Sequence, residues 1–270
     1  MIPAVLVLLA LSCGGGDAAT GEEAFSETKP SESGKALGDR EESGTGINET
    51  ESLMTVIDGV KQWAGPPKGL SGGLLIVYKD EFRVTVEMET VGGQPANGKK
   101  IVFDLYHSDF PFFRHGDLTF TVNNFVFLAR EGFYDGLPFH HVVPGTIIKT
   151  GDPPGPLDGA GYLFDNEPTV RIKHDRTGIV SMENKGIVDG KGTNSSQWFI
   201  TMTALPHLDT YDEELYERDC TLPDISCHTP FGVVIEGMDV VESIIEGDVI
   251  KSVTVEKLEN GTSKFDELTS

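Results

Sequence analysis

Two adjacent histidines, His140 and His141, are the first candidates for chemistry, because an imidazole can ligate a metal, transfer a proton or donate a hydrogen bond near neutral pH. They lie in an apolar run over residues 139–143 that is typical of a β-strand. Neighbouring side chains on a strand point to opposite faces, so the two imidazoles do not ligate one ion together. Cys220 and Cys227 have no second pair of Cys or His at ligand spacing. The sequence therefore predicts no metal site.

Two glycine-rich segments also resemble reactive motifs. Residues 69–73 fit the Gly-x-Ser-x-Gly pattern of a nucleophile elbow, which needs a strand before it and a helix after it. Here Pro66 and Pro67 come before it and a strand-like run follows. Residues 190–193 lack the glycine spacing of a phosphate-binding loop. Neither segment predicts a hydrolase or a nucleotide-binding protein.

The elements that must position any site are mostly strands. Short apolar or alternating runs predict strands at residues 74–78, 83–89, 100–106, 139–143, 147–150, 178–182, 197–202 and 249–258. Helical spacing predicts a helix through Val122 and Ala129 that ends at Gly132, and another through Met238 and Ile245 that ends at Gly247. Because strands do not alternate regularly with helices, the pattern favours an antiparallel barrel or sandwich.

The first 13 residues resemble the signal segment of a bacterial lipoprotein. An apolar run over residues 2–11 is too short to span a membrane and ends at Ser12 and Cys13, followed by glycines. In such a segment Cys13 carries the lipid. Ala10 stands where lipoproteins usually have Leu, and no Lys or Arg precedes the run, so an ordinary secretory signal is the alternative. We expect an exported protein, anchored to the membrane through Cys13 and facing the periplasm or cell surface.

Residues 14–50 predict a flexible tether, because nine acidic and three basic residues accompany almost no large apolar ones. In residues 51–80, apolar side chains from Leu53 to Trp63 recur at helical spacing and predict a short amphipathic helix, followed by a lead-in strand. The folded domain is expected at residues 81–258 and a polar tail at 259–270.

The formal net charge of −22 excludes nucleic acid as a class of partner, because each phosphate contact needs a Lys or Arg. Like-charge repulsion of this size keeps a protein soluble, and we expect a monomer.

Eight short segments occur in a fixed order along residues 81–258. They are residues 121–125, 132–136, 139–145, 151–153, 178–182, 192–201, 206–209 and 231–238. In this order they closely resemble the cyclophilin family of peptidyl-prolyl cis–trans isomerases. The resemblance implies a closed eight-stranded antiparallel β-barrel capped by two helices, and an activity that needs no cofactor.

The reaction that the resemblance implies is the rotation of the peptide bond before proline. Amide resonance gives this bond a barrier of about 18–20 kcal/mol. A catalyst holds the proline ring in an apolar pocket and aims a donor at the proline nitrogen, which becomes basic as the bond twists. The partners are therefore proline-containing segments of other polypeptides.

The resemblance also assigns roles to residues. The catalytic set is His141, Lys149, Asn184 and Gln197, in which Asn184 holds the client backbone and Gln197 orients it. The substrate-binding set is Val143, Thr146, Ile147, Glu183, Lys185, Phe199, His207, Leu208 and His228. Strand alternation agrees, because His141, Lys149 and Phe199 share one face, whereas Ile148 and Trp198 point to the core.

This sequence departs from the family pattern at the catalytic position. The family's arginine is His141 here, a usual glutamine is Lys149, and a Phe–Met pair is Thr146 and Ile147. If the hairpin turns at Gly145, Lys149 pairs directly with His141 and brings its ammonium near the place of the arginine. An ammonium is a point donor rather than a planar fork, so we expect partial rescue. The alternatives are that Lys149 extends into solvent or that His141 donates.

Residues 210–227 look inserted beside the pocket, and we call them the inserted loop. In an exported protein Cys220 and Cys227 within it favour a disulfide, the alternative being two free thiols. Two functions follow from the whole pattern. One is a folding catalyst for exported proteins; the other is a module that binds proline segments without useful turnover.

Overall fold

The computed structural model describes residues 54–57, 60–63, 80–106, 118–154, 159–259, 261–265 and 268. The signal segment with Cys13, the predicted tether and the strand predicted at residues 74–78 lie outside these ranges. No helix within them has the length and apolar character needed to cross a membrane.

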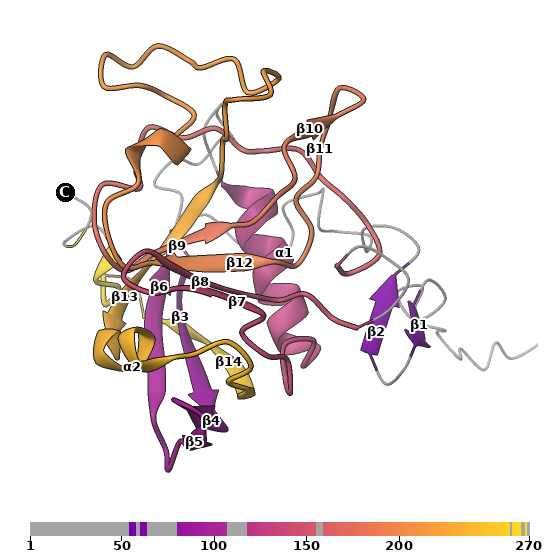
Figure 1. Ribbon diagram of the computed structural model, residues 1–270, viewed down its shortest axis with the longest axis vertical. Coiled ribbons are helices and arrows are strands. Elements are labelled where there is room, and N and C mark those ends of the chain that lie inside the picture. The colour runs from indigo at the N-terminus through magenta and orange to yellow at the C-terminus, as the bar shows by residue number, and fades with distance from the viewer. Residues whose placement is uncertain are drawn as a thin grey trace, which may run out of the picture. The chain divides into compact units, whose positions relative to one another are not determined.

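One antiparallel sheet of eight strands carries the fold (Figure 1). In spatial order its strands are β14 (Ile250–Leu258), β3 (Glu81–Met88), β6 (Lys100–Leu105), β13 (Pro230–Glu236), β9 (Ile179–Met182), β12 (Trp198–Thr201), β8 (Ile147–Thr150) and β7 (His141–Val143). Small two-stranded ladders join β1 (Met54–Ile57) to β2 (Val60–Trp63), β4 (Thr90–Val91) to β5 (Gln94–Pro95), and β10 (Ile187–Val188) to β11 (Lys191–Gly192). The mainly β, antiparallel architecture is confirmed.

The sheet is curled, but its two edge strands do not pair with each other along their length. Strand β7 has 3 residues, too few to match the 9 residues of β14. Instead, the segments before these strands meet at the bridge between Pro138 and Val249. There the Phe139 N–H donates to the Asp248 carbonyl at 2.8 Å. The sheet is thus a half-barrel joined at one end, and the closed barrel expected from the sequence is not seen.

Both helices predicted within the folded domain are present. Helix α1 spans Thr119–Arg130 and α2 spans Met238–Ser243, while Pro206–Leu208 form the short 3-10 helix η2. The Glu167 carboxylate accepts hydrogen bonds from the N–H groups of Phe120 (3.0 Å) and Thr121 (2.7 Å). A negative charge at this end satisfies free N–H groups and complements the helix dipole.

Aromatic rings fill the space between α1 and the sheet. The fully buried Trp198 has its ring centroid 5.9 Å from Phe103, 5.9 Å from Phe125 and 6.2 Å from Tyr134. Ile148 and Ile200, on the same face as Trp198, are also fully buried. The predicted core face of β8 and β12 is therefore confirmed, and their other face is left for the site.

The helix predicted near the start of residues 51–80 is wrong. Strands β1 and β2 form a hairpin in which Met54 pairs with Trp63 and Ile57 with Val60. In the sequence Asp58 and Gly59 lie between the two strands, and Asp-Gly between apolar runs is a strong signal for a two-residue hairpin turn. The β-branched Val56, Ile57 and Val60 also favour strands over helices. Helical spacing alone misled the prediction.

Part of the segment that was predicted to be a polar tail, residues 261–265, also packs against the sheet. Phe265 is 2% exposed and its ring centroid lies 5.7 Å from that of Tyr106. The Glu81 carboxylate accepts hydrogen bonds from three successive N–H groups, those of Gly261, Thr262 and Ser263. Residues 261–265 therefore complete the fold beside β3 and β6.

Candidate active site

A row of side chains crosses four strands at one level of the sheet. His141 in β7 pairs with Lys149 in β8, Lys149 pairs with Phe199 in β12, and Phe199 pairs with Ser181 in β9. Side chains directly opposite one another on an antiparallel ladder share a face, with Cβ atoms about 4.5–5.5 Å apart. The predicted pairing of His141 with Lys149 is confirmed, and Lys149 stands between the imidazole and the aromatic ring.

Lys149 does not extend freely into solvent. Its Nζ lies 2.7 Å from Glu183 Oε1, and the two side chains are 20% and 18% exposed. Glu183 directly follows β9, and Lys149 is in β8. The ion pair therefore spans the intervening strand β12. Partial burial makes such a pair stronger than one on the surface. The pair therefore holds the ammonium on the row of site residues.

The neighbouring His140 points away from this row and is half-buried. Burial lowers the pKa of His140 below its usual value, with Asp152 opposing the change. The ring is therefore mainly neutral at neutral pH, and the two adjacent histidines have separate surroundings. No group of three or more His, Cys, Asp or Glu side chains in the described ranges is arranged to hold a metal ion.

Two imidazoles hold the ring of Phe199. The His174 ring stacks on it with centroids 5.9 Å apart, and the His228 ring meets it edge-on at 5.4 Å. Phe199 is 1% exposed, so it is more deeply buried than its predicted position on the site face implies. The ring orientation is thus fixed from both sides, as an apolar floor for a small ring requires.

His174 is fixed in turn by a buried chain of hydrogen bonds. Its Nδ1 lies 2.7 Å from Asp209 Oδ1, and its Nε2 lies 2.8 Å from Ser181 Oγ. The order Asp–His–Ser resembles that of a hydrolase triad. However, His174 and Ser181 are both fully buried, so no substrate reaches the hydroxyl. No local pattern predicted this cluster, because Asp209 lies 35 residues from His174.

His228 connects the aromatic floor to the turn that carries Leu208. The His228 N–H donates to the Leu208 carbonyl at 2.9 Å, while ring atom Nδ1 lies 2.9 Å from the Met182 carbonyl. Asp209, the residue after Leu208, is bound to His174. The half-buried Leu208 is therefore anchored to both imidazoles that hold Phe199.

The other residues of the predicted substrate-binding set border this floor. Ile147 and Thr146 are half-buried at the start of β8, Val143 is 37% exposed at the end of β7, and His207 is exposed on η2. Ile147 lies two residues from Lys149 in β8 and so shares its face. The structure thus gathers Ile147, Lys149 and Phe199 on one face, with His141 and Val143 at its edge.

The wall of the site next to Glu183 contains Asn184, Lys185 and Gln197. A cavity of about 150 Å³ is lined by these residues together with Leu163 and Thr193. The Asn184 amide nitrogen donates to the Cys227 carbonyl at 3.0 Å, and its Oδ1 accepts from the Gly186 N–H at 2.9 Å. The Asn184 side chain therefore braces the wall of the site. Gln197 is half-buried and Lys185 exposed.

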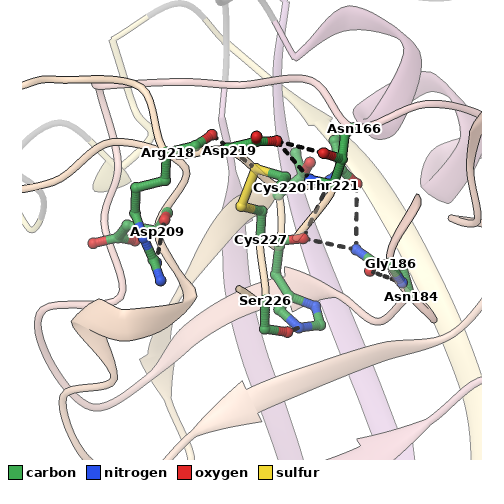
Figure 2. The surroundings of a disulfide bond; sticks show 12 residues. Asn166, Asn184, Gly186, Asp209, Arg218, Asp219, Cys220, Thr221, Ser226 and Cys227 are labelled. Carbon is green, nitrogen blue, oxygen red and sulfur yellow. Dashed lines mark hydrogen bonds between the residues drawn. A yellow bond between two sulfur atoms is a disulfide. The ribbon is translucent and has the colours of Figure 1, made fainter. Parts of the chain in front are cut away.

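Cys220 and Cys227 are joined by a disulfide, which closes part of the inserted loop (Figure 2). The carbonyl of Cys227 accepts hydrogen bonds from both Asn184 (3.0 Å) and Asn166 (3.2 Å). Figure 2 shows both amides directed at this carbonyl. The disulfide therefore connects the inserted loop to the wall of the site.

An apolar floor, a fixed aromatic ring and a row of hydrogen-bond donors define a site for a proline-containing peptide. Comparison with known proteins agrees with this class. The model of the "Cyclophilin type peptidyl-prolyl cis-trans isomerase/CLD" family matches residues 85–260. The chain therefore belongs to the cyclophilin family of peptidyl-prolyl cis–trans isomerases and is an enzyme of that class.

Individual relatives are bacterial and eukaryotic. Peptidyl-prolyl cis-trans isomerase B of Bacillus subtilis is 36% identical over 161 residues, covering 59% of this chain and 93% of that protein. Peptidyl-prolyl cis-trans isomerase ppi1 of Schizosaccharomyces pombe is 36% identical over 159 residues, covering 57% and 81%. A crystal structure of a Cryptosporidium parvum cyclophilin shares 25% identity at a TM-score of 0.46, covering 66% of this chain and 99% of that chain.

The buried imidazole of His228 makes the fold sensitive to mild acid. Burial is the main cause that lowers the pKa of His228, and the Glu183 carboxylate only partly offsets it. At mildly acidic pH the unfolded chain therefore binds more protons at His228 than the folded chain does. The stability that the neutral imidazole contributes is lost as pH falls below about 6.5. We expect the free energy of unfolding, measured in urea from pH 7.5 to 5, to fall less steeply in His228→Asn. Equal slopes in both proteins would contradict this.

Proposed function

We propose that this enzyme isomerises Xaa-Pro bonds in exported proteins, with Lys149 donating the hydrogen bond that the family's arginine donates. The observation that carries the proposal is the position of Lys149 between His141 and Phe199, in an ion pair with Glu183. Catalysis of this kind needs a donor that is already in place when the bond twists.

In the proposed mechanism, the proline ring lies against Phe199, with Leu208 and Ile147 at its sides. The peptide segment before proline runs along the backbone of Asn184, where Gln197 orients it. As the amide twists, its nitrogen loses resonance and becomes a hydrogen-bond acceptor. The Lys149 ammonium donates to this nitrogen, while Glu183 keeps the side chain directed across the site. No covalent bond forms or breaks.

The test measures cis–trans exchange of the Ala-Pro bond in a short peptide. The exchange is observed by NMR, with and without the full chain. Uncatalysed exchange takes roughly tens to hundreds of seconds. We expect the exchange to accelerate at catalytic amounts of protein. If the peptide binds, as seen by shifts of its resonances, but exchange is not accelerated, the chain is a binding module and the proposal fails.

We further propose that the protein is exported as a monomer and held at the membrane by lipid on Cys13, facing the periplasm or cell surface. The support is the small-residue sequence around Cys13 after a short apolar run. Stable anchoring by lipid needs more than one chain, which the multiply acylated cysteine of a bacterial lipoprotein supplies.

Anchoring through Cys13 predicts a change in partitioning on a single substitution. In a bacterial host, the unaltered protein is expected in the membrane fraction, whereas Cys13→Ser moves to the soluble fraction because it cannot be acylated. Cys220→Ser with Cys227→Ser is the matched control, since it removes the cysteines of the disulfide and leaves Cys13 in place. Membrane association of Cys13→Ser equal to that of the unaltered protein would rule the anchor out.

A further inference from the structure

The inserted loop exposes three large apolar side chains close together in sequence. Leu215 is 56% exposed, Tyr216 is 72% exposed and Leu222 is 51% exposed. Single exposed apolar residues are common, but a group of them on one protruding segment is typical of a contact surface. Tyrosine is also among the residues that contribute most at protein interfaces.

These apolar side chains are presented by two tight, internally bonded turns. In the first, the Asp212 carboxylate accepts from the N–H groups of Glu214 (3.1 Å) and Tyr216 (2.8 Å). In the second, the disulfide closes residues 220–227, and Asp219 accepts from the Thr221 N–H at 3.1 Å. A contact surface fixed before binding loses less conformational entropy when a partner docks.

The inserted loop is bound directly to the turn beside the proline pocket. The Arg218 guanidinium donates to the carbonyls of His207 (2.5 Å) and Asp209 (2.8 Å), and Figure 2 shows it directed at Asp209. An open groove of about 480 Å³ continues from Pro206 and His207 to Asp212 and Glu213. A polypeptide that leaves the pocket past Leu208 therefore meets this groove and then the loop.

The charge of the loop determines what it can bind. It carries six carboxylates and one cation, Arg218, whose guanidinium bonds to backbone carbonyls. None of the six carboxylates has an ion pair in the described part of the chain, although Asp212 and Asp219 accept hydrogen bonds within the loop. Lys173 lines the groove but leaves its charge balance negative. The complementary occupant is basic as well as apolar.

We propose that the inserted loop is a second docking surface for the client, which takes a basic, partly apolar segment flanking the Xaa-Pro bond. This inference rests on the proposed function for the position of the proline. Short proline peptides fill the pocket alone, whereas longer clients also contact the groove and the exposed apolar side chains of the loop.

The test compares peptides that share one central Ala-Pro bond. One is a tetrapeptide, and the others extend it by about ten residues on each side, with either Lys and Leu or Glu and Leu in the extensions. Binding is measured by calorimetry at low and high salt with the full chain. We expect the basic peptide to bind about 10-fold tighter than the acidic one, equivalent to about 1.4 kcal/mol, with most of this advantage lost at high salt.

Two variants and two matched controls locate the effect. Tyr216→Ala removes the most exposed apolar side chain, and Glu213→Lys with Glu214→Lys reverses the charge. The charge reversal is expected to abolish the preference for the basic peptide, whereas Tyr216→Ala is expected to weaken the binding of both extended peptides. Both variants are expected to leave tetrapeptide turnover unchanged. The controls Ile245→Ala and Glu246→Lys alter exposed residues outside the loop and are expected to keep the preference.

Equal binding of the basic and acidic peptides, or a preference that survives the charge reversal, would overturn the inference. Unchanged binding of the extended peptides by Tyr216→Ala would overturn it as well. So would a dimer seen by sedimentation that dissociates in Tyr216→Ala, because the loop would then bind a second copy of the chain. Failure of tetrapeptide turnover refutes the proposed function instead, since the tetrapeptide does not reach the loop.

Discussion

Replacement of Lys149 by Met is expected to lower kcat/KM for a short Ala-Pro peptide by about 10²-fold or more. Loss of one preorganised donor from a catalytic site typically costs ~10²–10³ in rate, and methionine keeps the length of the side chain without its charge. The Lys149→Arg variant is expected to retain activity, because it keeps a cation in the same row. His141→Ala is expected to change the rate little.

A variant of Glu183 controls for the loss of its ion-pair partner, because Lys149→Met leaves the Glu183 carboxylate unpaired. In the double variant with Glu183→Gln neither charge remains, so the fold is relieved of an unpaired carboxylate. We expect the double variant to be as inactive as Lys149→Met but closer in stability to the unaltered protein. The donor assignment is refuted if Lys149→Met keeps full activity while His141→Ala loses it. If His141→Arg instead raises a near-zero activity greatly, neither residue replaces the arginine.

Replacement of Phe265 by Ala is expected to destabilise the protein by about 3–5 kcal/mol, the usual cost of removing a buried phenylalanine. The ring is 2% exposed and packs against Tyr106. For a domain of this size the loss corresponds to a fall in Tm of roughly 6–20 °C. The measurement is thermal unfolding of the full chain.

Lys264→Ala is the matched control, because Lys264 is exposed and contributes its backbone N–H to Asp104, which alanine retains. Its Tm is expected to stay within a few degrees of that of the unaltered protein. A Tm for Phe265→Ala equal to that of the control would mean that residues 261–265 do not pack as described.

Local patterns predicted much of the fold and part of the site. A short hairpin fixes register by its turn, so the pairing of His141 with Lys149 followed from Pro144 and Gly145. Alternation along β8 and β12 placed Trp198 in the main hydrophobic core and left Phe199, also buried, outside it. The hairpin turn and the strand alternation both depend on residues close together in the sequence, so they can be recognised from the sequence alone.

Contacts between distant segments were not visible in the same way. The partner of Lys149 is Glu183, 34 residues away, and no local pattern relates the two. Asn184 was assigned to client binding, but its amide is occupied by the Cys227 carbonyl. The hairpin of β1 and β2 was mistaken for a helix because apolar spacing was weighed above the Asp58-Gly59 turn signal.

The row of His141, Lys149 and Phe199 also determines where the chain tolerates changes in length. Side chains on a strand alternate between faces, so one extra residue in the turn between β7 and β8 would move His141 or Lys149 to the core side of the sheet. The inserted loop has no such constraint, because Arg218 and the disulfide hold it in place rather than strand register. Among related sequences, we therefore expect insertions and deletions in the inserted loop. The spacing of eight residues from His141 to Lys149 is expected to stay constant.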